Sequence, residues 1–178
     1  ERGDLRALPL VGRTPERESV FDFTFPYLTM HGAVVVRNDT TGIHGAADLA
    51  GRRLAVMKGD NAEEFVRRTG LGGELVTTET FVDAFRLLSE GGCDAVIVQR
   101  LVALRLLDET GIKNLRLVAQ PIAGFIQDFC FAVKDGDRET LSLLNEGLAL
   151  IMADGTYRRL HAKWFASLEL PSSRRIVV

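Results

Sequence analysis

Short apolar runs alternate along this chain with longer stretches in which apolar residues recur at helical spacing. Residues 21–25 alternate apolar and polar positions, and residues 32–36 form an apolar run rich in β-branched side chains, so both segments are predicted to be strands. Residues 80–90 place their apolar side chains on one stripe of a helix. This alternation of strand and helix patterns predicts an α/β fold with mostly parallel strands.

The same patterns predict most of the remaining elements. Further strands are expected at residues 53–57, 74–77, 94–98, 115–118 and 129–133, and further helices at residues 62–68, 101–110, 137–153 and 156–165. Three of the helices are expected to end at a glycine, namely Gly70, Gly111 and Gly155. The longest helix is expected to face the core with Leu141, Leu144, Leu148, Ile151 and Met152.

The order of these elements divides the chain into two lobes. Residues 37–123 form a complete small α/β unit, lobe 2, and residues 1–36 and 124–178 come together as lobe 1. The chain is expected to cross between the lobes near residues 34–36 and 127–129. An α/β lobe inserted into another lobe is typical of hinged proteins that close around a ligand.

Composition describes an ordinary soluble globular protein. Of the 178 residues, 46% are hydrophobic and 26% are charged, and the net charge is −2 with the basic residues scattered, which argues against a nucleic-acid partner. No run reaches the roughly 20 apolar residues of a membrane helix.

The residues that most often carry chemistry do not cluster in the sequence. Cys93 and Cys130 lack metal-ligand spacing and are expected to be buried free thiols rather than a disulfide. The three histidines are dispersed, and neither a phosphate loop nor a Gly-x-Ser-x-Gly elbow occurs. No metal, cofactor or catalytic residue is therefore predicted.

One run of residues resembles a known family. The sequence Thr14-Pro15-Glu16-Arg17, followed by Asp22-Phe23-Thr24 and Pro26-Tyr27, is similar to the mid-lobe signature of the type 2 periplasmic solute-binding proteins, the bacterial extracellular solute-binding proteins of family 3. Similar stretches follow in order at residues 48–56, 59–62, 87–96 and 155–165. The resemblance implies a two-lobed Venus-flytrap fold with hinge crossings. The family's first βαβ portion is missing, so we expect an incomplete first lobe and a preceding segment.

The resemblance also implies a ligand site in lobe 1. In the family the arginine equivalent to Arg17 binds a ligand carboxylate, and its planar guanidinium matches such a group bidentately. Thr14 offers a hydroxyl, and Tyr27 is expected to be a wall or packing residue of the site. The alternative for Arg17 is a solvated arginine, or one paired with Glu16 or Asp22.

Lobe 2 is expected to contribute a helix N-terminus, whose free N–H groups and dipole favour an anion. The residues concerned are Gly59, Asp60, Asn61 and Ala62. Across a closing cleft, this helix and Arg17 would clamp one negatively charged group. Asp60 stands where the family usually has Ser or Thr, and its carboxylate would repel an anion, so the alternative is that Asp60 caps the helix.

A second departure concerns the ligand ammonium. Family members that bind α-amino acids usually place an aspartate where this chain has Gln99, which can hydrogen-bond but supplies no charge. Asp128, in the second crossing segment, is a candidate substitute. Glu63 and Glu64 are adjacent on a helix and are expected to be solvated charges.

Three functions follow from the resemblance. The first is the extracytoplasmic ligand-sensing domain of a membrane signalling protein such as a sensor histidine kinase, whose kinase would lie in other domains. The second is a periplasmic binding protein of an ABC importer for polar amino acids. The third is an enzyme on this scaffold, such as a cyclohexadienyl dehydratase, which would need an acid or base that we do not identify. The expected ligand is an amino acid or organic acid, and the expected partners are membrane-attached signalling domains or an ABC permease.

Overall fold

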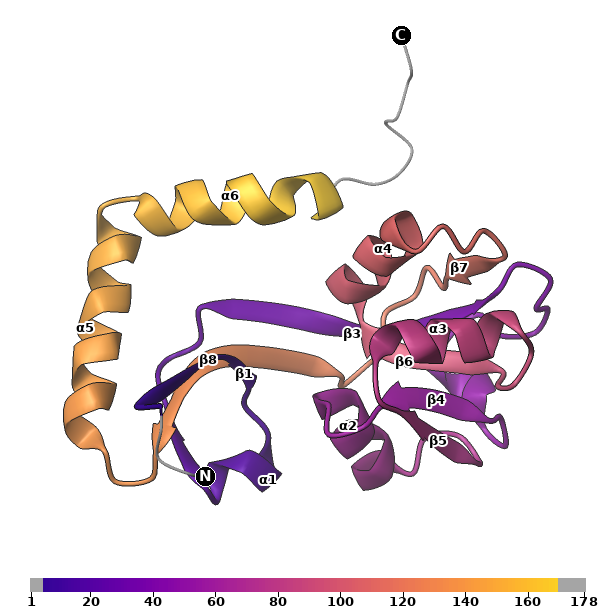
Figure 1. The fold of residues 1–178 in the computed structure, drawn as a ribbon, viewed down its shortest axis with the longest axis horizontal. Coiled ribbons are helices and arrows are strands. Elements are labelled where there is room, and N and C mark those ends of the chain that lie inside the picture. The colour runs from indigo at the N-terminus through magenta and orange to yellow at the C-terminus, as the bar shows by residue number, and fades with distance from the viewer. Residues whose placement is uncertain (1–4, 170–178) are drawn as a thin grey trace, which may run out of the picture. The chain divides into compact units, whose positions relative to one another are not determined.

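The computed structural model describes residues 5–169, and the chain folds into two compact units (Figure 1). Unit 1 comprises the chain up to Leu28 and from Asp128 onward, and unit 2 comprises Thr29–Gln127. The chain passes between the units at Leu28–Thr29 and at Gln127–Asp128. The sequence predicted crossings near residues 34–36 and 127–129 and a second lobe that ends at residue 123. Unit 2 therefore begins before the expected residue 37, because the apolar run at 32–36 pairs with strands inside this unit.

The elements alternate between strands and helices as the pattern predicted. Unit 1 contains β1 (Ala7–Gly12), α1 (Pro15–Glu18), β2 (Phe21–Phe23), α5 (Arg138–Ala153) and α6 (Thr156–Glu169). Unit 2 contains the 3-10 turn η1 (Ala46–Leu49), β4 (Leu54–Met57), α2 (Asn61–Thr69), β5 (Leu75–Thr78), α3 (Phe81–Ser89), β6 (Ala95–Gln99), α4 (Arg100–Glu109) and β7 (Leu115–Leu117). The long strands β3 (Leu28–Arg37) and β8 (Ile126–Lys134) contribute residues to both units. The order of hydrogen-bonded neighbours is β1-β8-β3-β6-β4-β5.

The strands are less parallel than expected. Strand β4 pairs in parallel with β5 and with β6, whereas β3 runs antiparallel to β6 and to β7, and β1 and β2 run antiparallel to β8. The parallel strands are those joined by the crossover helices α2 and α3, because a parallel pair needs a long connection. The prediction of mostly parallel strands is therefore wrong outside this part of unit 2.

The core of unit 2 has two faces separated by the sheet. Val34 and Val36 of β3 pack in one apolar cluster with residues of α2, and Val35 packs in the other with residues of α3 and α4. Because side chains alternate across a strand, one apolar run supplies both clusters. Helix α2 therefore covers one face of this sheet, while α3 and α4 cover the other (Figure 1).

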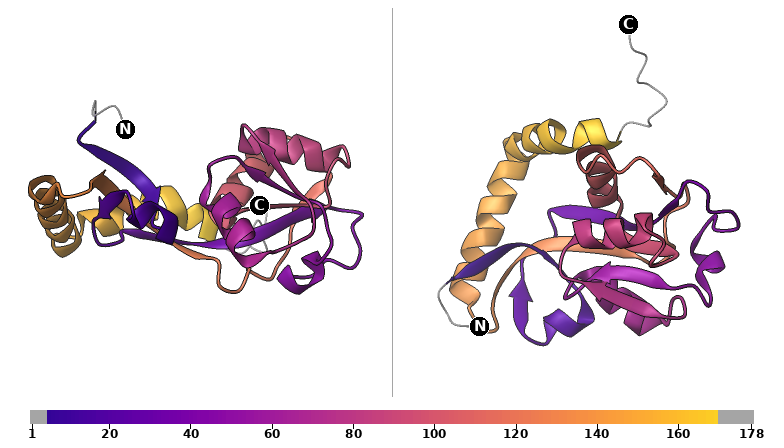
Figure 2. Two further views of the ribbon diagram at one scale, coloured as in Figure 1. Left: turned by 90° about the horizontal axis from the view of Figure 1, so that it is seen from below. Right: turned by 45° about the vertical axis from the view of Figure 1, so that its right-hand side comes forward.

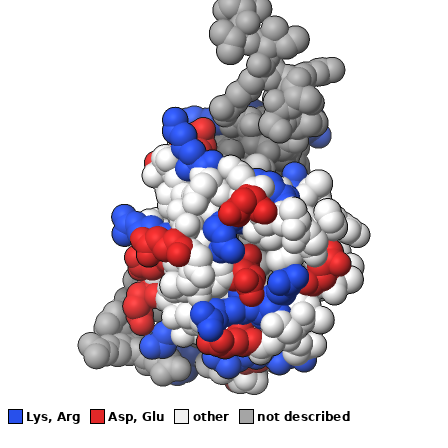
Figure 3. Space-filling model, turned by 90° about the vertical axis from the view of Figure 1, so that its right-hand side faces the viewer, with Lys and Arg blue, Asp and Glu red and all other residues white. Residues whose placement is uncertain are grey.

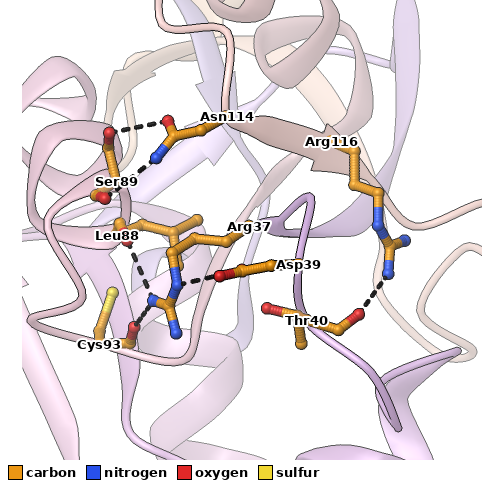
Figure 4. Close-up of polar contacts among 8 residues, drawn as sticks. All are labelled: Arg37, Asp39, Thr40, Leu88, Ser89, Cys93, Asn114 and Arg116. Carbon is orange, nitrogen blue, oxygen red and sulfur yellow. Dashed lines mark hydrogen bonds and ion pairs between the residues drawn. The ribbon is translucent and has the colours of Figure 1, made fainter.

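Polar contacts surround Arg37, the last residue of β3, in unit 2 (Figure 4). The Arg37 Nη1 donates to the carbonyl oxygens of Leu88 and Cys93, at 3.1 and 2.7 Å, and so satisfies one backbone acceptor in the last turn of α3 and one in the loop that follows it. The Asn114 Nδ2 donates to the Ser89 carbonyl at 3.1 Å. These contacts fix the loop before β6 and the entry to β7, because a buried carbonyl left unpaired would be costly.

In unit 1, β8 pairs with both shorter strands, in the registers Gly12↔Phe129 and Phe21↔Lys134. Helix α6 changes direction from α5 after Gly155 (Figure 2). Along α5, Leu148 is buried, but Met152 is 38% exposed and is not the core residue that the periodicity predicted. Met152 lies in the last turn of α5, where the described residues leave it accessible.

Neither unit carries a helix, within residues 5–169, that is long and apolar enough to cross a membrane. The face of the molecule drawn in Figure 3 shows Lys and Arg interspersed with Asp and Glu. Exposed ion pairs of the described residues include Arg53 with Glu74, at 2.9 Å. Pairs of this kind contribute little to stability.

Both cysteines are free and buried, as expected from the sequence. Burial raises the pKa of Cys93 and that of Cys130 to about 11, so neither forms the reactive thiolate at neutral pH. We expect Ellman's reagent to titrate no thiol in the folded protein at mildly alkaline pH and both thiols after denaturation in guanidinium. Rapid reaction of either cysteine in the native state would contradict this burial.

Candidate functional site

Thr14 and Arg17, the candidate residues nearest the N-terminus, lie on the single-turn helix α1 and its cap in unit 1. Thr14 is 2% exposed and is the N-cap of α1, its Oγ1 accepting from the Arg17 backbone N–H at 3.4 Å. Pro15 occupies the first turn, where it is favoured because its fixed φ suits a helix start. Thr14 therefore positions the turn that carries Arg17.

The Arg17 side chain is half-buried. Its Nη1 donates to the carbonyl oxygen of Gly12 at 3.3 Å, which anchors the guanidinium at the end of β1. Next to this anchor, the Arg13 backbone N–H donates to the carbonyl of Asp128 at 2.8 Å, so the loop before α1 is tied to β8. Unit 1 thus holds the candidate anion-binding residue Arg17 and the candidate acid Asp128 on adjoining segments.

Tyr27 is integrated into the packing of unit 1. Its ring lies against Phe131, with centroids 5.1 Å apart, and its hydroxyl accepts from the Leu10 N–H at 2.9 Å. The Tyr157 hydroxyl donates to the Tyr27 carbonyl. Burial raises the pKa of Tyr27 above its ordinary value. These contacts are those of a packing residue, and the sequence led us to expect a wall or packing role for Tyr27.

The candidates in unit 2 gather where two parallel strands end. Strands β4 and β6 are hydrogen-bonded neighbours, so their carboxyl ends meet at one edge of the sheet, the edge where open α/β sheets bind ligands. Helix α2 begins with Asn61 shortly after β4, and α4 begins directly after Gln99, the last residue of β6. The Gln99 Nε2 donates to the Asn61 Oδ1 at 2.8 Å, and both residues are 2% exposed.

This amide pair leaves one polar atom unsatisfied. The Gln99 Oε1 is buried and accepts no hydrogen bond from the residues that the structure describes. An acceptor in this state carries the desolvation cost of a lost hydrogen bond, which a donor from outside the protein would remove. Among the candidate residues of unit 2, Gln99 is therefore the one with a buried side-chain atom that lacks a hydrogen-bond partner within residues 5–169.

The N–H groups at the start of α2 are already occupied by the chain's own carboxylates. Asp60 is the N-cap, its Oδ2 accepting from the Ala62 N–H at 3.1 Å, which confirms the capping role considered from the sequence. The Glu63 Oε2 accepts from the Gly59 N–H at 2.7 Å, and its Oε1 pairs with the Arg67 Nη2 at 2.7 Å. An anionic ligand group would find these two donors engaged and two carboxylates beside it.

Glu63 was expected to be a solvated charge, and that expectation is wrong. Its side chain is only 16% exposed, because the Gly59 N–H and the Arg67 guanidinium both hold it against the helix start. Glu63 follows the N-cap Asp60 by three residues, a known capping pattern. The contact of Glu63 with the helix start could therefore have been predicted from the sequence. The hydrogen bond from Gln99 to Asn61 had no such local signal.

The bond from Gly59 lowers the pKa of Glu63 below its ordinary value of 4.5, and the Arg67 guanidinium adds to this effect. Because the folded-state pKa is depressed, the stabilisation is complete above that ordinary value and is lost as the pH falls through the folded value. We expect Glu63→Gln to lower the free energy of unfolding by about 0.5 kcal/mol at neutral pH, after allowing for solvent screening.

Urea unfolding at neutral pH and well below pH 4.5 would measure this difference. It should disappear in acid, where Glu63 itself is protonated. The same substitution at the exposed Glu146 serves as the control and should show no pH-dependent difference of this kind. A Glu63→Gln deficit that persists unchanged in acid would contradict the assignment.

Comparisons with known proteins agree on one family. The model of the bacterial extracellular solute-binding proteins, family 3, matches residues 7–167. The L-cystine-binding protein TcyJ of Escherichia coli (strain K12) is 32% identical over 154 residues, which cover 85% of this chain and 56% of that protein. This chain thus spans little more than half the length of that relative.

Two solved structures are similar throughout most of this chain. A histidine kinase sensor domain with similarity to periplasmic binding proteins has 34% identity and a TM-score of 0.85, covering 92% of this chain and 71% of that one. The substrate-binding protein of an amino acid ABC transporter has 28% identity and a TM-score of 0.82, covering 92% and 72%. These likenesses confirm the periplasmic-binding-protein-like α/β fold predicted from the sequence. With its family model matched from residue 7 to residue 167, the chain belongs to the bacterial extracellular solute-binding proteins, family 3.

Proposed function

We propose that this chain is the ligand-sensing, extracytoplasmic domain of a membrane signalling protein of the sensor histidine kinase type. The observation that carries the proposal is the likeness to a solved histidine kinase sensor domain, at 34% identity and a TM-score of 0.85. Signalling domains and the membrane tether would lie elsewhere in the protein, and the domain itself binds a solute without transforming it.

A second candidate function is that of a periplasmic binding protein for an ABC importer of polar amino acids. The L-cystine-binding relative and the binding protein of an amino acid ABC transporter favour it. The neutral Gln99, at the position where the family places an acid for the ligand ammonium, supports the sensor over the importer.

In either function the ligand belongs to the amino acid or organic acid class. Arg17 anchors its carboxylate, because a half-buried guanidinium offers a charge-assisted, bidentate pair. Thr14 holds the turn that carries Arg17, and Tyr27 supports the surrounding packing. Asp128 remains the candidate partner of a ligand ammonium in unit 1, and Gly59, Asp60, Asn61, Ala62 and Gln99 remain the candidate residues of unit 2.

The full-length protein separates the two functions. Membranes that contain it should autophosphorylate in response to a solute that also raises the melting temperature of the purified protein, and the Arg17→Ala variant should lose both responses. Loss of uptake of that solute when the gene is deleted, without any phosphorylation, would favour the importer. A coding sequence that ends after this domain would refute the sensor.

A further inference from the structure

Helix α6 is attached to unit 1 through one of its faces. The rings of Tyr157, His161 and Phe165 are four residues apart and lie against one another, with centroids 5.8 and 5.1 Å apart. The Tyr157 hydroxyl donates to the Tyr27 carbonyl, which ties this face to the chain just before β3. The exposed side chains on the other faces of α6 are therefore not explained by this attachment.

Two exposed stripes run along α6 beside this face. Leu160 and Trp164 are four residues apart and are 48% and 61% exposed. Arg159 and Lys163 are exposed as well, and each directly precedes one of these apolar residues, so a basic stripe neighbours the apolar one. The Lys163 Nζ lies 5.1 Å from the centroid of the Trp164 ring. Exposed apolar and basic side chains in this arrangement are typical of a helix that lies on a membrane surface.

The charge at this end of the chain is opposite to that of the rest. Residues 155–178 contain five of the chain's 22 Lys and Arg but only one, Glu169, of its 24 Asp and Glu. The rest of the chain therefore carries an excess of acids, although Lys and Arg occur throughout. A basic segment at one end of an otherwise acidic protein indicates an anionic partner. Anionic lipid complements both the charge of α6 and its exposed apolar stripe.

We propose that the lipid-facing surface of this protein is the exposed face of α6 formed by Arg159, Leu160, Lys163 and Trp164, and that it docks on anionic phospholipid. Leu160 and Trp164 enter the boundary between headgroups and acyl chains, while Arg159 and Lys163 pair with lipid phosphates. This surface goes beyond the proposed function, which places the domain at a membrane, and it uses none of the candidate ligand residues.

Trp164 is the only tryptophan in the sequence, so its fluorescence reports on this face directly. The purified protein is mixed with vesicles of phosphatidylcholine, with and without phosphatidylglycerol. We expect the emission to shift to shorter wavelength and the protein to co-sediment only with the vesicles that contain phosphatidylglycerol. Both effects should weaken as salt is added, because salt screens the attraction between exposed charges and the lipid.

Matched variants locate the surface. Arg159→Gln combined with Lys163→Gln should weaken co-sedimentation about tenfold, because each basic residue near an anionic surface contributes to binding. Arg86→Gln combined with Arg105→Gln is the control, since both arginines are exposed on helices of unit 2 and the same charge is removed. This control should bind vesicles as the parent does. Leu160→Ala leaves the charge unchanged and should also weaken binding about tenfold.

The other outcomes overturn the lipid-facing surface. They include no spectral shift and no co-sedimentation at low salt, and equal losses in the two arginine and lysine double variants. A short-wavelength emission without lipid that vesicles leave unchanged means that the protein itself covers Trp164. A dimer in sedimentation velocity that Leu160→Ala dissociates means that a second copy covers this face. None of these results bears on solute binding, which is refuted separately if no amino acid or organic acid stabilises the protein.

Discussion

Replacing Arg17 by alanine is expected to lower the affinity for a carboxylate ligand about a hundredfold, or about 3 kcal/mol. The reason is that removal of one partner leaves the ligand carboxylate desolvated without its charge-assisted bidentate bond. The measurement is calorimetry with the standard amino acid or organic acid that gives the largest thermal shift with the parent protein. Arg17→Lys keeps the charge but not the planar guanidinium, so its ligand affinity should lie between those of the parent and Arg17→Ala.

The control for this experiment is the neighbouring Arg13→Ala. Arg13 is exposed and pairs with Glu18, so its removal should leave ligand affinity unchanged. Urea unfolding of both variants without ligand checks the fold, because Arg17 also donates to the Gly12 carbonyl. If the parent and the Arg17→Ala variant bind the ligand with equal affinity, Arg17 does not contact the ligand carboxylate.

Gly32→Ala is expected to destabilise unit 2 by about 3 kcal/mol. A Cβ at this position would lie 1.9 Å from the Cδ1 of Phe125. Phe125 cannot turn aside easily, because it is 2% exposed and its ring stacks on Phe65 with centroids 4.4 Å apart. The backbone is equally confined, since the Gly32 N–H donates to the Phe125 carbonyl at 2.7 Å. Urea unfolding of the purified variant measures the loss.

Gly147→Ala provides the control of opposite sign. Gly147 lies within α5, and no described residue comes within 4 Å of an added Cβ there, so alanine should stabilise the helix by about 1 kcal/mol. If the clash with Phe125 is the cause, Gly32→Ala combined with Phe125→Ala should cost less than the sum of the two single changes. Additive losses would contradict the clash.

Local patterns predicted most of the elements because their causes are local. The apolar stripe of α3, the left-handed Gly70 that ends α2 and the β-branched run within β3 each act over a few neighbouring residues. The cap of α2 belongs to the same class, and Asp60 with Glu63 marks it in the sequence. These features need no knowledge of which segments meet.

The pairing of distant segments was less accessible from the sequence. An apolar run is compatible with a parallel or an antiparallel neighbour, so the antiparallel pairs of β3 with β6 and β7 were not foreseen. For the same reason the first crossing was placed at residues 34–36, although the chain enters unit 2 at Thr29. Only the hydrogen-bond partners of a strand decide which unit it joins.

The candidate site likewise has features that follow from local sequence and contacts that depend on the tertiary structure. The sequence alone determined the family signature around Arg17, the helix start at Gly59 to Ala62, and the absence of an acid at Gln99. The tertiary structure decided that Gln99 meets Asn61, 38 positions away in the chain, and that its Oε1 finds no partner among residues 5–169. That contact exists because β4 and β6 run side by side in parallel and end at one edge of the sheet, a register that no local pattern encodes.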